Sequence, residues 1–575
     1  MRIQEIETLT GLTRKSIRYY EDKGLIRVCR SGNSYREYDD ETLTRLRLIA
    51  ALRQAGISIA TLQLWTDGVI SAAELLQGRI GELRDAAASN SGQRELCEQM
   101  LAGLKNDDFP QDVYAASVAP RDETVESPIP TGGTLCLGID IGTTTLSAAL
   151  IDITHRRQLE SYTLANDSTM PGKPYEHMQN ARRITERVTR LIDALSARYP
   201  HIRAIGVTSQ MHGIVYTDAD GGILSPLYTW QDSRASLPFG DSTYAEVLGI
   251  SAGYGLATHF YNVQNQLVPA GAHRFSSIGD LIAMKLSGNS EPMVHPSMAA
   301  SFGLFDAAAG RFTDKAAPFA DLLPAVVGDG IIGDYHGIPV AAAIGDNQAS
   351  FFGAVREPGR SVLANFGSGS QISMATSLMT DISGSLELRP YVAGAQLFCG
   401  SALCGGRAYA MLERFFGAFM SASGMGGSHY ETLNRLAMEN LDRPLHVRTT
   451  FCGTRDEPSM RGLIDGIGED SFTPGALAAG ILRGMAEELH GMLFEMDKRR
   501  PETTPIDRLV ASGNAVRKNP ALRETLTRVF GMKPAIPHHT EEAAFGAALY
   551  AAKCAGLADD VTLRECIRYE QEDEI

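Results

Sequence analysis

The sequence is poor in cysteine, and it has neither long apolar runs nor closely paired cysteines. Eight cysteines in 575 residues are too few for a disulfide scaffold, and none of them belongs to a C-x-x-C pair that would indicate a metal site. No stretch approaches the roughly 18 consecutive apolar residues that a membrane helix needs. The first residues (MRIQEIE) carry acidic side chains where a secretory peptide would have its apolar core. We therefore expect a cytoplasmic protein without membrane spans or a structural metal.

The length and the charge distribution predict several domains with unlike surfaces. At roughly 150 residues per domain, a chain of 575 residues corresponds to about four compact units. The net charge is −15, which argues against nonspecific binding of nucleic acid by the whole chain. Residues 1–60, however, hold eleven Lys and Arg against eight Asp and Glu, so this part has a net positive charge and the net negative charge comes from the remainder. This asymmetry favours a nucleic-acid-facing head on an acidic body.

One segment separates these two parts. Residues 106–133 are rich in proline, aspartate, glutamate and serine, and they show neither helical nor strand periodicity. This composition predicts a flexible linker. Short helical patterns dominate before it. After it, apolar runs such as residues 135–141 alternate with helical stretches such as residues 181–199, which is typical of an α/β fold.

The first 38 residues have the spacing of two short helices followed by a basic hairpin. Apolar residues recur at helical spacing in residues 3–9, Gly11 interrupts them, and Thr13 is a suitable N-cap for a second helix. A Ser-Gly-Asn turn within residues 27–38 predicts the hairpin, or wing. The second helix offers cations for phosphate oxygens and planar side chains for a groove. The candidate DNA-contact residues are Arg14, Lys15, Arg18, Tyr19, Tyr20 and Arg36.

This head resembles the MerR family of transcriptional regulators. The resemblance rests on four segments, which are residues 17–21 (IRYYE), 24–26 (GLI), 35–38 (YREY) and 43–59. It implies a homodimer that bends and untwists promoter DNA, with Arg18, Tyr19 and Arg36 near the backbone or groove. The structural alternative is that the tyrosines only pack the core of the head.

Relatives of this kind usually dimerise through a long antiparallel helix after the head. Here an apolar stripe runs through residues 75–83 and again through residues 96–104, but Ser-Asn-Ser-Gly at residues 89–92 interrupts it. The interruption favours a broken helix or a helical hairpin over one continuous coiled coil.

The body begins with a buried strand, a turn of small residues and a returning strand in residues 137–150. The exposed N–H and O–H groups of such a turn can cradle phosphate, and Asp140 can hold Mg²⁺ through water. It is not a Walker loop, because G-x-x-x-x-G-K-[ST] does not occur in the chain. The candidate phosphate-binding residues of this first turn are Gly142, Thr143, Thr144 and Thr145.

Three later motifs complete a phosphoryl-transfer pattern. Asp346 follows an apolar run in a glycine-flanked turn, where a carboxylate can take the proton of a sugar hydroxyl as the bond to phosphorus forms. An aspartate in such a turn is also common as a simple helix or turn cap. The interpretation of Asp346 as a base therefore rests on its order among the other motifs. A second Gly/Ser turn could give N–H groups to phosphates, and a later pair of segments could form a nucleotide shelf. The residues concerned are Gly367, Ser368, Gly369 and Ser370 in the turn, and Gly513, Asn514 and Glu542 near the nucleotide.

A fifth group carries the chemistry of a polyol pocket. A sugar needs fixed donors and acceptors together with an aromatic wall. Two segments supply them, Ser-Gln-Met-His-Gly at residues 209–213 and Thr-Trp-Gln-Asp-Ser-Arg at residues 229–234. His212 could instead be a core histidine, and Arg234 could be a structural partner of Asp232. The candidate substrate-binding residues are Gln210, Met211, His212, Trp230, Asp232, Arg234 and Asp346.

The order of these motifs resembles the FGGY family of carbohydrate kinases, in the actin-like ATPase superfamily, over residues 134–555. The resemblance implies two lobes with ribonuclease-H-like cores, ATP and Mg²⁺ as cofactors, and Asp346 as the general base. The Met-His-Gly triplet is similar to ketose kinases such as xylulokinases. Trp-Gln-Asp and the segment at residues 253–262 are most similar to sedoheptulokinases. Where many ketose kinases have Glu-Gln-Asp before the first long helix, this chain has His-Met-Gln-Asn at residues 177–180.

The predicted fold is therefore multidomain, with an α-helical winged helix-turn-helix head and an α/β two-lobe actin-like kinase body. The predicted function is phosphorylation of a ketose, sedoheptulose first, with possible sugar-responsive regulation of transcription. The alternatives are a regulator whose kinase-like body only senses sugar or nucleotide, and a xylulokinase-like or ribulokinase-like pentulose kinase. The predicted segments are residues 1–70 (head), 71–105 (dimerisation helix or hairpin), 106–133 (linker), 134–345 and 346–560 (the two lobes) and 561–575 (acidic tail).

Overall fold

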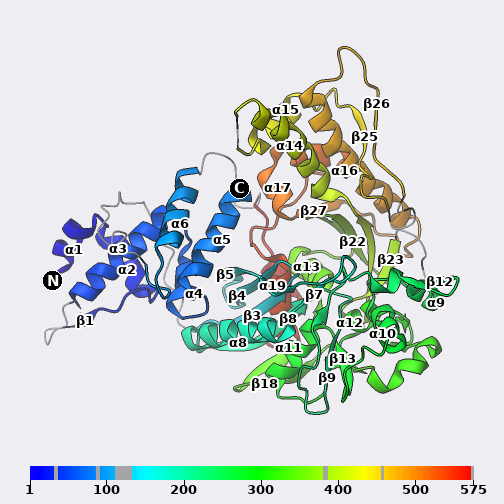
Figure 1. The fold of residues 1–575 in the computed structure, drawn as a ribbon, viewed down its shortest axis with the longest axis horizontal. Helices are drawn as coiled ribbons and strands as arrows, with labels where there is room; N and C mark the ends of the chain where they lie inside the picture. The colour runs from blue at the N-terminus through cyan, green and yellow to red at the C-terminus, as the bar shows by residue number, and fades with distance from the viewer. Residues whose placement is uncertain are drawn as a thin grey trace.

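The computed structural model describes residues 1–30, 36–85, 91–109, 132–379, 382, 386–425, 427–454, 457 and 459–570. Figure 1 shows the helical head, in blue, lying beside one lobe of a larger two-lobe body. The multidomain architecture predicted from the sequence is confirmed.

The head is a helix-turn-helix with a short wing. Helix α1 (Ile3–Thr10) ends at Gly11, whose φ of 71° is the left-handed conformation that glycine adopts most easily. Thr13 caps α2 (Arg14–Asp22) by accepting a hydrogen bond from the Ser16 amide. The wing strands β1 (Cys29–Arg30) and β2 (Arg36–Glu37) pair antiparallel, as predicted, and the turn between them lies outside the described residues. Helices α3 (Asp40–Gln54) and α4 (Ile59–Thr66) complete the head.

Helices α5 (Ala72–Asp85) and α6 (Ser91–Gly103) follow and pack against each other. The apolar stripe expected to form a dimer seam is buried within the chain itself: Leu75, Leu76, Ile80 and Leu83 are each at most 5% exposed. They share one continuous core with the head and the first lobe. A dimer through this stripe would have to break that core.

The first lobe is built on a twisted mixed sheet. Strands β3 (Leu135–Ile141) and β4 (Thr145–Asp152) form the predicted antiparallel hairpin, and β3 runs parallel to β8 (Ile202–Ser209). The order is β18-β19-β8-β3-β4-β5, and β20 (Ile344–Gly345) also pairs with β8. The outer strands are β5 (Arg157–Ala165), β18 (Ile331–Tyr335) and β19 (Ile338–Ala341).

Helices and short strands surround this sheet. The helices are α8 (Ala181–Arg198), α9 (Tyr244–Leu248), α10 (Gly255–Gln264), α11 (Ile278–Ser287) and α12 (Pro296–Ser301). The short strands are β6 (Thr169–Met170), β7 (Met178–Gln179), β9 (Val215–Thr217), β10 (Leu227–Tyr228), β11 (Pro238–Phe239), β12 (Ser242–Thr243), β13 (Arg274–Ser276), β14 (Met293–Val294), β15 (Phe305–Asp306), β16 (Arg311–Phe312) and β17 (Ala325–Val326).

The second lobe has a sheet of order β23-β24-β22-β21-β27. Its strands are β21 (Ser361–Phe366), β22 (Ser370–Thr376), β23 (Leu386–Pro390), β24 (Gln396–Ala402) and β27 (Arg508–Ser512). Its other elements are α14 (Gly405–Ala422), α15 (Tyr430–Glu439), β25 (His446–Arg448), β26 (Leu463–Asp465), α16 (Pro474–Asp497), α17 (Asn514–Lys518) and α18 (Pro520–Phe530).

Two helices cross between the lobes at very close range. Helix α19 (Glu542–Cys554), red at the centre of Figure 1, packs on β3, β4 and β8 and against α13 (Asp346–Ala354). A Cβ atom on Gly138 would lie 1.8 Å from the Ala544 carbonyl oxygen, and one on Gly546 would lie 1.8 Å from that of Ala349. These contacts admit only glycine. Although predicted as part of the second lobe, α19 completes the sheet packing of the first.

The predicted acidic tail is mostly folded. Helix α20 (Asp560–Glu565) is followed by Ile567 and Tyr569, which are at most 2% exposed, and the Tyr569 hydroxyl donates to the Ala354 carbonyl. Apolar residues spaced among the charges explain why this segment packs. At the predicted linker, Phe109 packs edge-on against Trp65, and residues 110–131 and 571–575 lie outside the described residues. Within the described chain, no helix combines the length and apolarity of a bilayer crossing.

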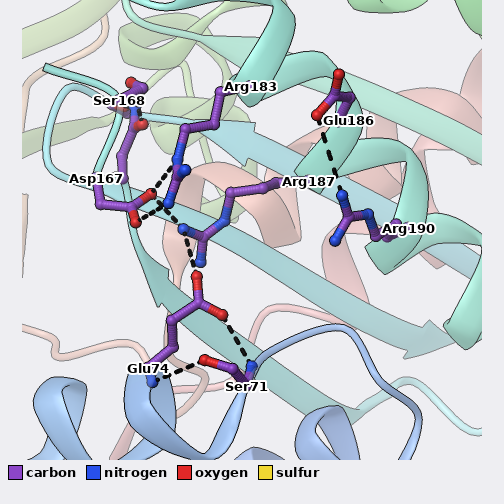
Figure 2. A network of polar contacts seen from close by, with 10 residues as sticks. Ser71, Glu74, Asp167, Ser168, Arg183, Glu186, Arg187 and Arg190 are labelled. Atoms are coloured by element: carbon purple, nitrogen blue, oxygen red, sulfur yellow. Dashed lines mark hydrogen bonds and ion pairs between the residues drawn. The ribbon is translucent and has the colours of Figure 1, made fainter. Parts of the chain in front are cut away.

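The head docks on the edge of the first lobe. Lys23 of α2 pairs with Glu160 of β5 at 2.7 Å, Asp67 pairs with Arg198, and Glu74 of α5 pairs with Arg187 of α8 at 3.2 Å. Figure 2 shows the last of these contacts, in which Arg187 also reaches Asp167. Head and body are therefore in direct contact, in addition to being joined by the linker.

Candidate active site

Three parallel strands end side by side and bring the predicted acidic residues to one edge of the first sheet. In the register of the sheet, Asp140 of β3 lies opposite Thr208 of β8, and Gly345 of β20 lies opposite Ser209. Asp346 follows Gly345 directly as the first residue of α13. Because ligands of α/β folds bind beyond the carboxyl ends of parallel strands, this edge is the candidate active site.

Asp140 carries a buried carboxyl oxygen without a partner among the described residues. Its Oδ1 atom is buried without a hydrogen-bond partner in the described part of the chain. Burial, together with the negative charges of Asp346 and Glu541, raises the pKa of Asp140 well above the ordinary carboxyl value. A bound cation would offset both the cost of burying this carboxylate and its repulsion from Asp346 and Glu541. Carboxylate oxygen is also the ligand that Mg²⁺ prefers. The residue therefore fits the predicted magnesium role.

Two opposing effects act on the pKa of Asp346. Burial raises the pKa of this carboxyl, while the Arg389 guanidinium opposes the shift. Its Oδ1 accepts a hydrogen bond of 2.7 Å from the Asn347 amide. A carboxylate with a raised pKa, held at a helix start, is suited to accept a proton at neutral pH.

The first turn is linked to the predicted sugar pocket. The Trp230 indole donates to the Thr143 hydroxyl over 3.0 Å, and that hydroxyl donates to Gln210 Oε1 over 3.1 Å. Gln210 in turn donates to Gln179. Asn166 closes the turn by donating to the Gly142 carbonyl, and Thr144 is exposed. Thr143 therefore positions Trp230, whose ring is 47% exposed and can form the aromatic wall.

His212 is held as part of the same surface. Its Nδ1 lies 2.9 Å from the Ser301 carbonyl, which requires a proton on Nδ1, and its ring stacks on Tyr254 at 4.5 Å. The backbone φ of His212 is +70°, which is unusual for a residue with a side chain. The Met-His-Gly triplet therefore makes a fixed turn, with Met211 against Gly345 beneath it.

Asp232 and Arg234 do not offer free groups to a sugar. They are 0% and 2% exposed and form a two-bond ion pair, with Nε to Oδ1 at 2.7 Å and Nη2 to Oδ2 at 2.9 Å. Arg234 also donates to Asn262, and Asp232 accepts from the His177 amide. This arrangement favours the structural alternative, and direct contact of the two residues with a substrate stays a prediction. The pair holds the segment that presents Trp230.

The second phosphate turn faces the start of a long helix. Residues 367–369 are exposed, Ser370 is 4% exposed, and the Ser370 hydroxyl has no partner within the described residues. The Gly406 amide donates to the Gly367 carbonyl, and a Cβ on Gly405 would lie 2.0 Å from the Ser370 hydroxyl oxygen. Because α14 begins at Gly405, its N-terminal dipole adds to the turn's N–H groups in favour of an anion.

The predicted nucleotide residues also come together. Gly513 adopts φ +96° beneath the Phe366 carbonyl, and Asn514 begins α17 in an exposed position. Glu542 pairs with Arg517 at 2.8 Å, and both are largely buried. Residues 361–370 and 508–517 are neighbours because β21 and β27 run parallel.

Three residues of this region, Arg389, Glu387 and Tyr254, are not among the site residues predicted from the sequence. Arg389 of β23 is 8% exposed, approaches Met211 and pairs with Glu387, which accepts a hydrogen bond from the Tyr254 hydroxyl. Thus the second lobe reaches over the sugar pocket of the first. The available signal was a pair of opposite charges two residues apart within a buried strand.

The candidate DNA-contact residues of the head divide into two groups. Arg14, Lys15 and Arg18 are exposed along α2, and Arg36 pairs with Glu21 at 2.6 Å. Tyr19 and Tyr20 are only 8% and 1% exposed. Their rings belong to the packing of the head in this structure, so the DNA-contact prediction rests on the cations.

Comparison with known proteins identifies both parts. Residues 1–68 match the MerR HTH family regulatory protein model, and residues 135–238 and 394–555 match the N-terminal and C-terminal domains of the FGGY family of carbohydrate kinases. The chain joins a MerR-type head to an FGGY carbohydrate kinase. Its body is accordingly an enzyme of the sugar kinase type.

Individual relatives agree with this division. The body is 27% identical to the sedoheptulokinase of Mus musculus over 470 residues, covering 72% of this chain and 96% of the relative. The head region is 28% identical over 134 residues to the HTH-type transcriptional regulator CueR of Escherichia coli O6:H1, covering 22% of this chain and 90% of the relative. A xyloylose kinase from Brucella ovis shares the fold of the FGGY body, with a TM-score of 0.65, 21% identity and coverage of 76% and 93%.

Proposed function

We propose that the body transfers the γ-phosphoryl group of ATP to a hydroxyl of a ketose, with sedoheptulose as the preferred substrate. The observation that carries this proposal is the edge at which Asp140, with an unsatisfied carboxylate oxygen, and Asp346 follow the ends of parallel strands, with the first phosphate turn between β3 and β4. The sedoheptulokinase relatives, which the chain covers almost completely, support the seven-carbon sugar.

Each residue has a defined task in this proposal. Asp346 takes the proton of the attacking hydroxyl as the new oxygen–phosphorus bond forms and the bond to ADP breaks. Trp230 and His212 hold the sugar, and the turns at residues 142–145 and 367–370 hold the phosphates. Mg²⁺ held near Asp140 through water would neutralise charge on the transferred group.

Coupled ADP-release measurements on a panel of ketoses, polyols and glycerol test the proposal. We expect the highest kcat/KM with sedoheptulose, and a loss of about 10²–10⁴-fold in the Asp346→Asn variant, since this is the usual contribution of a general base. Turnover with xylulose or ribulose but not with sedoheptulose would show that the substrate is a pentulose. Sugar binding without any turnover would overturn the enzyme assignment for this chain and favour a sugar or nucleotide sensor.

We also propose that the head binds promoter DNA containing an inverted repeat, as a homodimer whose contact surface lies outside the buried α5 stripe. The direct docking of the head on the sugar kinase body favours a DNA affinity that depends on sugar. Arg18→Ala should weaken the mobility shift of such DNA, because it removes an exposed phosphate contact. Arg190→Ala, on α8 of the body, is the matched control. Equal binding by both variants would exclude the predicted surface.

A further inference from the structure

A cavity of about 500 Å³ lies between the head and the kinase body, and none of the predicted catalytic, phosphate-binding or sugar-binding residues lines it. The head contributes residues of α2 and α4, and the body contributes β5, the segment at residues 538–540 and the folded end of the chain. A volume in this range suits a small metabolite.

Cations dominate the lining of this cavity. Lys23, Arg156, Arg157 and Arg568 line it, and Glu160 is the carboxylate among the lining residues. Lys23 is paired with Glu160, and Arg156 is paired with Glu565. Arg157 and Arg568 form no ion pair in the part of the chain that the structure describes. Two guanidinium groups are therefore available for an anion, and guanidinium groups favour phosphate because of their planar donor pairs.

Two buried polar atoms of the lining residues also need a partner. Arg157 Nε and His539 Nε2 are buried without a hydrogen-bond partner among the described residues. His539 is 5% exposed and stacks on Phe545 at 3.7 Å, which fixes its ring. Burial, reinforced by Arg517, lowers the pKa of His539 to about 3, so the ring is neutral and can satisfy a ligand hydroxyl or N–H group. Unsatisfied buried groups are costly, and a bound polar ligand would remove that cost.

We propose that this cavity binds a small phosphate compound, with the phosphate held by Arg157, Arg568 and Lys23 and a polar group beside His539. The ketose phosphate made by the kinase and free inorganic phosphate share this chemistry. The choice of ketose phosphate as a source rests on the proposed function, whereas the cationic cavity does not.

The position of the cavity links the ligand to both halves of the protein. Its phosphate would bridge Lys23 of the head and two arginines of the body, so binding favours the docked head. On the body side, Thr540 is hydrogen-bonded to Gln158 of β5, and Glu541 accepts from Thr163. The same segment leads directly into α19, which begins at Glu542 on the predicted nucleotide side. The ligand would therefore connect product level, head position and nucleotide site.

Isothermal titration calorimetry of the full chain tests this proposal. The kinase site is first saturated with ADP and unphosphorylated ketose, and ketose phosphate or inorganic phosphate is then titrated in separate experiments. We expect one additional binding event. It should weaken at least tenfold in Arg157→Gln and in Arg568→Gln and stay unchanged in Arg190→Gln, a surface arginine of α8.

The two titrants distinguish the source of the phosphate. Tighter binding of the ketose phosphate assigns the cavity to the product, and equal binding assigns it to the phosphate group alone. Ketose turnover of Arg157→Gln and Arg568→Gln should remain normal, which shows that the variants are folded. No binding by either compound, or equal binding by all three variants, would overturn the proposal. Because titration needs no turnover, its failure is distinct from failure of the kinase assignment.

Discussion

The first lobe of the body handles charge in opposite ways at two of its edges. At the catalytic edge, a carboxylate oxygen of Asp140 is buried without a partner. At the head-docking edge, Glu160, Asp67 and Glu74 each meet a cation across the domain boundary. Charges that must receive a ligand are left unsatisfied at a cost in stability, whereas charges that join domains are paired. The first lobe can therefore bind a ligand at one edge and hold the head at the other.

The largest expected effect comes from replacing the buried carboxyl of Asp140, whose Oδ1 is partnerless in the described chain. Asp140→Asn should lower turnover by about 100-fold or more, because it removes the carboxylate that we propose holds Mg²⁺. The same change should raise the apparent Tm in Mg²⁺-free buffer by about 1–3 °C, since burial and repulsion from Asp346 are relieved. Kinetics and thermal melts of one preparation measure both. A fall in both turnover and Tm would show that Asp140 stabilises the fold. It would contradict the contrast drawn between the two edges.

The next effect concerns the pH dependence of turnover through Asp346, the proposed general base. The Arg389 guanidinium holds the pKa of Asp346 down against the effect of burial. In Arg389→Met the pKa of Asp346 should rise, so the base is protonated at higher pH. The acid limb of the kcat/KM profile should therefore move to higher pH. Arg508→Met, a surface change in the second lobe, should leave the limb in place. An unshifted limb in Arg389→Met would remove Arg389 from the catalytic electrostatics.

A smaller effect is expected at the docking edge. Arg187 is buried and contacts both Glu74 of α5, which packs with the head, and Asp167 of the body, so Arg187→Met should weaken docking by about 1–2 kcal/mol. Hydrogen exchange of β5 and α5 amides should become faster, while kinase turnover stays normal. Arg190→Met is the matched control, because Arg190 is exposed and lies 4.0 Å from Glu186 on the same helix. Equal effects of both changes would show that the ion pair does not hold the head.

The smallest effect is the response of this edge to mild acid. Burial raises the pKa of Asp167, but Arg183 and Arg187 more than offset it, so the pKa lies below the ordinary value. Its ion pairs therefore contribute fully above the ordinary aspartate pKa of about 4 and are lost only as the pH falls through the lowered one. The same exchange rates should be constant from pH 8 to pH 5 after correction for intrinsic exchange. A change within that range would mean that another group controls docking.

Local patterns in the sequence predicted much of the fold and part of the site. The helix-turn-helix and the first hairpin depend on neighbouring residues, such as the Thr13 cap and the alternation after Asp140, and both are confirmed. The second Gly/Ser turn also lies between paired strands.

Contacts between segments that are distant in the sequence could not be predicted from local patterns. Arg389 reaches Met211 across 178 positions, and Lys23 reaches Glu160 across 137, so neither spacing carries a signal. For Asp232 and Arg234, by contrast, the local pattern suggested a role that their burial does not favour. Their residue types suited a sugar pocket, but complete burial directs the two charges to each other. Similarly, the charges after residue 560 predicted a tail, although the apolar residues between them pack.

The close contacts between α19 and glycines of the first sheet also affect the order of folding during synthesis. Gly138 and Gly206 on early strands accept a helix that the ribosome makes only near the end of the chain. During synthesis the head can fold while the first lobe still lacks the helix that covers its sheet. A nascent or truncated chain that ends before Glu542 would therefore carry a folded reader of DNA without a finished kinase.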